Sequence, residues 1–162
     1  MSGEEPVAEQ KIISWLFDNI FYFSGSAKLD DNLKPIRKYC EGVLKQEEPC
    51  LYDAWDEAVL KDIISEQRKA VHDAKKAGKT IMPSIIIVCD DMMDDKMAMG
   101  GGILQQIFTR GRHFYCSCFL MTQKLRVIAH NQAAVRVNAN ALVMFRARNE
   151  KDVQAMIEET AR

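Results

Sequence analysis

The chain has 162 residues, of which 48% are hydrophobic and 28% charged, and its formal net charge is −1. These values are typical of one globular domain with an ordinary core, and they exclude a disordered, collagen-like or strongly basic protein. No apolar run approaches the ~20 residues needed to span a bilayer, and the polar, acidic first residues are unlike a secretory signal. We therefore expect an intracellular, soluble protein that does not associate with a membrane.

The charges are unevenly distributed along the chain. Between Met97 and Arg148 there is no Asp or Glu, so the rest of the chain is acidic. A basic C-terminal half favours contact with phosphate, of a nucleotide or of nucleic acid. Alternatively, acids elsewhere in the fold neutralise it. The bases in this window are Arg110, Arg112, Lys124, Arg126, Arg136, Arg146 and Arg148.

The five cysteines are odd in number and irregular in spacing, and the three histidines are scattered. Cys116 and Cys118 lie two residues apart in an apolar run, so on a strand both would face the same way. Neither pattern is typical of a zinc site. We interpret the cysteines as small buried hydrophobic residues in a reducing compartment.

In chain order, residues 1–16 are expected to form a flexible tail and residues 17–162 one domain. The β-branched and aromatic run Asn19–Phe23 predicts a strand that ends in a Ser-Gly-Ser turn. A helix capped by Asp30 or Asp31 should follow and end near residue 46. The strongest helix is predicted from Trp55 to Ala77, with Gly78 as its C-cap.

The second half alternates apolar strands with helices. The run from Ser84 to Cys89 is continuously apolar, as in a strand buried on both faces of a parallel sheet. The further elements expected are a helix over Ile103–Arg110, a strand over Phe114–Met121, a polar helix from about Lys124 to Val135, a strand over Ala141–Phe145 and a closing helix over Glu150–Ala161.

Such alternation predicts an α/β fold with a mostly parallel sheet and right-handed crossovers. In these sheets, ligands bind beyond the carboxyl ends of the strands. The Asp90-Asp91 and Thr122-Gln123 pairs both follow predicted strands, so we expect them to converge in space.

The run Ile85-Ile-Ile-Val-Cys89 followed by two acids has the form of a Walker B motif. A rigid buried strand would fix Asp90 to hold Mg²⁺, and Asp91 could then orient the attacking water. Gln123, at the end of the next strand, could sense a γ-phosphate. The alternatives are a solvated acidic turn for the acid pair and an ordinary loop residue for Gln123.

Two arginines, Arg110 and Arg112, stand between the acid pair and the next strand. An arginine placed there could reach the nucleotide of a neighbouring subunit as a finger. The alternative is a solvated basic turn or a structural ion pair.

These segments occur together in an order that resembles the genome-packaging ATPases of large DNA viruses, the poxvirus-type branch of the FtsK/HerA superfamily. The order is IIIVCDD, a helix, TRGRH, an apolar strand and TQ, followed by Val-Arg-x-Asn at Val135–Asn138 and a strand that ends in RARN at Asn149. The resemblance covers roughly residues 17–160 and is tightest from 84 to 150.

The resemblance implies a three-layer P-loop NTPase of the RecA/FtsK type. It makes Asp90 the Mg²⁺ ligand, Asp91 the catalytic acid, Gln123 the sensor, and Arg110 or Arg112 the finger. It further implies ATP and Mg²⁺ as cofactors, a homo-oligomeric ring, double-stranded DNA as the translocated partner, and a location in the host cytoplasm, the nucleus or the virion.

The phosphate-binding loop GxxxxGK[ST] does not occur in this sequence. Gly78-Lys79-Thr80 is no substitute, because it lacks the upstream glycine and ends a helix where a P-loop begins one. We therefore expect a partial domain without its first strand and P-loop. It could be a fragment of an active motor, or an inactive remnant that binds nucleic acid or joins a ring. A third possibility is an unrelated α/β domain.

Overall fold

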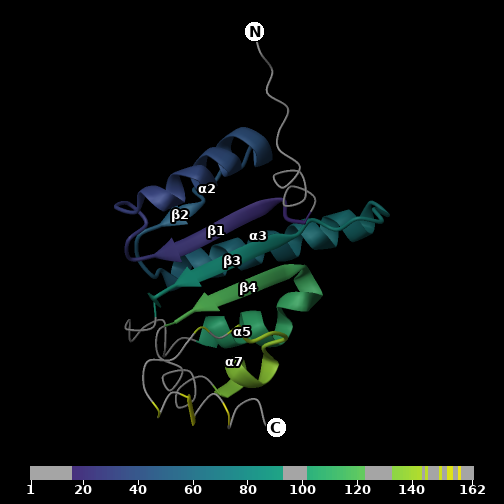
Figure 1. The fold of residues 1–162 in the computed structure, drawn as a ribbon. Helices are drawn as coiled ribbons and strands as arrows, with labels where there is room; N and C mark the ends of the chain where they lie inside the picture. The colour runs from purple at the N-terminus through teal and green to yellow at the C-terminus, as the bar shows by residue number, and fades with distance from the viewer. Residues whose placement is uncertain are drawn as a thin grey trace.

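The structure is a computed structural model that describes residues 16–92, 102–122 and 133–143, together with residues 145, 150, 153, 154 and 157. Within these ranges, four parallel strands form one sheet in the order β2-β1-β3-β4 (Figure 1). The predicted α/β class with a parallel sheet is confirmed. The strands are β1 (Asn19–Ser24), β2 (Leu51–Tyr52), β3 (Ile85–Asp90) and β4 (Cys116–Met121).

The helices connect these strands in the predicted order. Helix α3 begins two residues later than expected, because Asp56 is its N-cap and accepts hydrogen bonds from the Ala58 and Val59 amides. The helical elements are η1 (Asp31–Leu33), α2 (Lys34–Tyr39), the π-helix η2 (Cys40–Leu44), α3 (Glu57–Lys76), α5 (Gly102–Arg110), the 3₁₀-helix η4 (Gly111–Phe114) and α7 (Ala133–Asn138).

Each face of the sheet has a helical cover. Alternate strand residues such as Phe21, Phe23 and Ile87 join the main core with α3 and α5, and α3 runs behind the sheet in Figure 1. Tyr22, on the opposite face, packs with Leu33 and neighbours in a smaller cluster beside α2. This arrangement follows from the period of two along a strand, which sends successive side chains to opposite faces.

The end of α3 settles the role of Gly78-Lys79-Thr80. Gly78 has φ +67°, its N–H bonds to the Lys75 carbonyl at 3.1 Å, and the Lys79 N–H bonds to the Ala74 carbonyl at 3.0 Å. This pair of bonds is the Schellman ending that glycine favours. The prediction that this segment is a helix C-cap is confirmed.

Strand β2 was not predicted. It is two residues long and pairs with β1, and the Tyr52 ring stacks on Phe23 with a centroid distance of 4.6 Å. A two-residue strand leaves no periodic pattern in a sequence, so only its neighbour in the sheet defines it.

The prediction of a strand over Ala141–Phe145 is wrong. Residues 141–143 and 145 have no strand structure, and Val143 and Phe145 are exposed. A strand forms only by bonding to a neighbouring backbone, and none of the four described strands has this segment as a neighbour.

Other predictions are tested only in part. The tail of residues 1–15, the helix from Lys124 to residue 132 and much of the closing helix lie outside the described residues, although residues 150, 153, 154 and 157 are helical. All five cysteines are free, four of them are buried, and Cys118 is partly buried. Cys116 and Cys118 both pack on the main core, so they share one face of β4 as expected.

Candidate functional site at the carboxyl edge of the sheet

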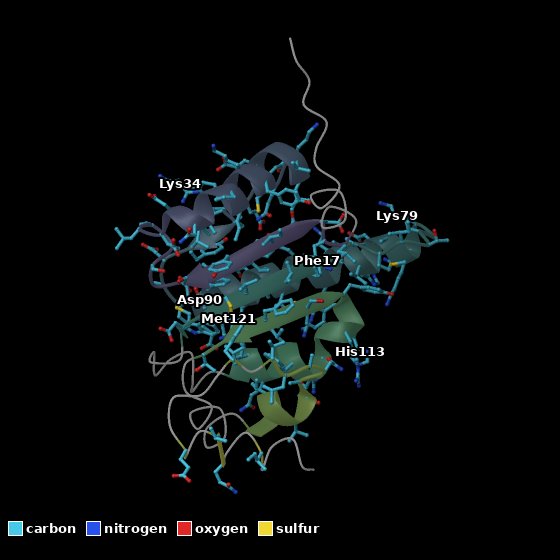
Figure 2. The ribbon with its side chains drawn as sticks, in the orientation of Figure 1. Phe17, Lys34, Lys79, Asp90, His113 and Met121 are labelled. Atoms are coloured by element: carbon cyan, nitrogen blue, oxygen red, sulfur yellow. The ribbon has the colours of Figure 1, made fainter. Side chains whose placement is uncertain are left out.

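Asp90 is the last residue of β3, between the ends of two neighbouring strands. In the sheet register it stands opposite Ser24 of β1 on one side and Met121 of β4 on the other. Figure 2 shows Asp90 and Met121 close together at this end of the sheet. The acid pair therefore lies beside the end of β4, as expected, up to Met121, the residue before Thr122.

The Asp90 carboxylate is held by two hydroxyl groups of β1. Tyr22 Oη donates to Asp90 Oδ2 at 2.9 Å, and Ser24 Oγ donates to the same oxygen at 3.4 Å. Ser24 is buried, and its Oγ lies 3.1 Å from Ser26 Oγ. Burial and the neighbouring Asp90 carboxylate raise the pKa of Tyr22 to about 12, with a smaller contribution from Asp30. At neutral pH, the Tyr22 hydroxyl is therefore protonated and donates its hydrogen bond to Asp90.

Asp91 turns the chain away from the sheet. It is exposed, has φ +51°, and its N–H bonds to the Met121 carbonyl at 3.2 Å. The left-handed region is unfavourable for most residues, but Asp tolerates it better than most and such strain concentrates at functional sites. The turn separates the two carboxylates, with Asp90 held against β1 and Asp91 exposed to solvent.

Gln123, the predicted sensor, lies outside the described residues, as do Asp94 and Asp95. Thr122 precedes it directly and is partly exposed at the end of β4. Strand β4 therefore carries the chain to the Asp90 end of the sheet, and position 123 follows immediately.

Arg110 and Arg112 lie at the other end of the sheet. They are exposed at the end of α5 and in η4, which precede β4. The six residues of β4 span about 20 Å, so these arginines are separated from the carboxyl edge by roughly the length of the strand. His113 marks that end in Figure 2, opposite Asp90. Neither arginine belongs to the Asp90 site of its own chain.

The oxygen donors at the Asp90 edge fit Mg²⁺ better than a softer metal. Asp90, Asp91 and the Ser24 hydroxyl are hard ligands, and Mg²⁺ commonly takes one or two carboxylates and completes its shell with water and substrate phosphates. Within the described ranges, no group of three or more His, Cys, Asp and Glu side chains could hold a metal alone.

Comparison with known proteins identifies no relative: no protein-family model, curated protein or solved structure matches the chain. Among the helices of the described residues, none is long and apolar enough to cross a membrane.

Sequence reasoning identified the acid pair but missed Tyr22 and Ser24 as the hydrogen-bond donors to Asp90. The available signal was the strand Asn19–Ser24, which ends in hydroxyl residues two positions apart, so that both face the same way. That signal gains meaning only when the register places this strand beside β3.

Proposed function

We propose that this chain is the Walker B and sensor half of a P-loop ATPase of the FtsK/HerA type, whose family-level function is ATP-driven translocation of double-stranded DNA during viral genome packaging. The observation that carries the proposal is the position of Asp90 and Asp91, at the carboxyl end of a central, buried, parallel strand. In parallel α/β sheets, this is the edge where ligands bind.

The order of the strands supports the proposal. In the resembled family, the P-loop strand lies between the sensor strand and the last strand. Here β4, the proposed sensor strand, is the outermost strand of the described sheet, and the apolar residues at 141–143 and 145 form no strand. An absent central strand would account for both features. The helical cover on each face also fits the three layers of a P-loop NTPase.

The resemblance suggests a role for each site residue, and the contacts of Asp90 support the first of them. Asp90, oriented by Tyr22 and Ser24, would hold Mg²⁺, which when bound neutralises charge on the phosphates of ATP. Asp91 faces solvent and would orient a water molecule. Arg110 or Arg112, remote from Asp90 in its own chain, would act on the nucleotide of the next subunit in a homo-oligomeric ring. Gln123 would be the sensor.

Metal binding by the chain itself provides the first test. Mn²⁺, a paramagnetic substitute for Mg²⁺, should broaden the amide resonances of Ser24, Asp90 and Asp91 before others. Asp90→Asn should abolish this selectivity, whereas Asp62→Asn, which alters an exposed acid on α3, should leave it intact. Equal broadening in the parent chain and in Asp90→Asn would contradict the proposal.

Hydrolysis provides the second test. Without GxxxxGK[ST], this chain should show no Mg²⁺-dependent ATP hydrolysis, because it lacks the backbone amides and the lysine that cradle the phosphates. A longer chain that carries a strand and this loop ahead of residue 17 should hydrolyse ATP, and Asp91→Asn should silence it. Turnover by the 162-residue chain that Asp91→Asn abolishes would refute the need for the loop.

The second candidate function is a non-enzymatic module that binds nucleic acid or joins a ring as a passive subunit. The missing phosphate-binding loop and the acid-free window from Met97 to Arg148 favour it. Such a module would bind duplex DNA with an affinity that falls steeply with salt and would not respond to ATP, Mg²⁺ or Asp91→Asn.

A further inference from the structure

A cavity lies at the end of the sheet remote from Asp90. It is a cavity of about 280 Å³ between α3, the last residue of α5 and η4. Its lining consists of Arg68, Val71, His72, Lys75, Arg110, His113 and Phe114. Because η4 directly precedes β4, the cavity lies at the amino end of that strand. Its lining includes neither Asp90 nor Asp91.

The lining is basic, without a compensating acid. Three of its members, Arg68, His72 and Lys75, recur at i, i+4 and i+7 on α3 and therefore share one side of that helix. Arg110 and His113 face them from the neighbouring turn. In the part of the chain that the structure describes, all three ion pairs lie elsewhere: Lys28–Asp53, Lys34–Asp31 and Lys61–Glu57.

Phe114 forms the floor of the cavity and makes two contacts with residues of α3. Phe114 is buried, and its carbonyl accepts a hydrogen bond of 2.8 Å from Nε2 of the buried Gln67. The Arg68 guanidinium carbon lies 4.9 Å from the centre of the Phe114 ring, a cation–π contact that holds the guanidinium over the ring. Gly111 lets the turn before β4 pack closely on the strand, because a Cβ there would lie 2.7 Å from the Cys116 carbonyl oxygen.

We propose that this cavity binds the phosphate group of a small ligand, as a phosphomonoester or a pyrophosphate. Guanidinium groups match phosphate oxygens with paired N–H donors, and Arg68 is already oriented by its aromatic neighbour. The volume lies just below the common range for small-molecule pockets, roughly 300–1,000 Å³, which suits a compact anion. Val71 and Phe114 supply an apolar wall against which the organic part of a phosphomonoester packs.

The test uses the whole chain with pyrophosphate at low ionic strength and with EDTA present. EDTA removes divalent metal, so binding at the proposed Mg²⁺ site does not contribute. Amide chemical shifts should move around Arg68, Lys75 and His113, while those of Asp90 and Asp91 stay in place. Asp90→Asn should bind pyrophosphate as the parent chain does, which keeps the outcome independent of the ATPase proposal.

Matched variants locate the site. Arg68→Gln and Lys75→Gln change exposed side chains and should preserve the fold, and Arg68→Gln should weaken pyrophosphate binding roughly tenfold, as expected for the loss of hydrogen bonds to a charged group. Lys69→Gln and Lys76→Gln make the same chemical change at adjacent exposed positions outside the lining and should leave the affinity unchanged. Equal losses in all four variants would overturn the proposal, because they would indicate a diffuse charge effect.

The source of the phosphate is distinguished by parallel titrations. If adenosine monophosphate binds more tightly than inorganic phosphate and also shifts the Val71 amide, the ligand is a nucleotide-like phosphomonoester. If pyrophosphate binds more tightly than both adenosine monophosphate and inorganic phosphate, the ligand is a free diphosphate. The proposal fails if none of these anions moves the lining amides, or if only duplex DNA does so.

Discussion

Replacing Tyr22 by Phe removes one oxygen atom from the candidate site and leaves the packing of the ring in place. That oxygen donates to Asp90 Oδ2 at 2.9 Å. A hydrogen bond to a charged group contributes about 1.5–3 kcal/mol. Asp90 is partly exposed, so water screens part of the interaction, and we expect Tyr22→Phe to lower the free energy of unfolding by about 1–2 kcal/mol at pH 7.

The same oxygen makes the difference between parent and variant depend on pH. The pKa of Tyr22 is about 12 in the folded chain and 10.0 for an unperturbed tyrosine. Because the folded pKa is raised, the stabilisation is complete below pH 10 and is lost as the pH rises from 10 to 12, where the unfolded chain ionises first. The thiols of Cys40 and Cys116, whose pKa values burial raises to about 12, also lower stability above pH 9, but equally in both chains.

Urea denaturation of the parent chain and Tyr22→Phe from pH 7 upward measures this difference directly. It should stay constant to about pH 9 and then shrink, by at most about 1.4 kcal/mol per pH unit. Tyr115→Phe is the matched control, because its ring is exposed and the change should be within about 0.5 kcal/mol. A double-mutant cycle with Asp90→Ala should give a coupling of about 1 kcal/mol, and a coupling within about 0.3 kcal/mol of zero would refute the assigned bond.

Three further changes test the fold around the two sites. Gly111→Ala should lower stability in thermal unfolding by about 2 kcal/mol or more, because its Cβ would overlap a backbone carbonyl, whereas Gly25→Ala, which meets nothing within 4 Å, should stay within about 0.5 kcal/mol. Gln67→Leu should cost about 2–3 kcal/mol in urea, since the buried Phe114 carbonyl and the partly buried Pro83 carbonyl lose their donor, and Lys69→Leu on the exposed side of α3 should be nearly neutral. Alkylation of Cys116 by iodoacetamide at pH 8 should be at least about tenfold slower than in the urea-denatured chain, because burial raises its thiol pKa to about 12; equal rates would contradict the buried placement.

The fold was largely predictable wherever one pattern determined an element. The continuous apolar run at Ile85–Cys89 indicated a strand buried on both faces, and the charged-and-apolar period of residues 57–76 indicated α3. Boundaries depended on single caps, so Asp56 moved the start of α3 to Glu57. The strand over Ala141–Phe145 failed because apolar composition states only that a segment can pair, while pairing also requires an available neighbour.

The candidate site was predictable in its acids and not in its partners. Asp90 and Asp91 follow a strand signal directly, whereas the contact between Tyr22 and Asp90 spans 68 residues and exists only through the register of β1 with β3. The same limit applies to the basic cavity. Arg68 and His113 come from segments that the sequence analysis placed in different elements, and nothing in their spacing indicates that they meet.

The outer position of β4 also affects how the chain behaves at high concentration. Among the described strands it has a single neighbour, β3, and its Phe119 and Met121 side chains are exposed. The segment Cys116–Met121 contains no charge and no proline, the features with which natural edge strands prevent edge-to-edge pairing. Among the described strands, β4 is therefore the one whose side chains favour edge-to-edge pairing, and Phe119→Lys should improve the solubility of the protein with little effect on the core.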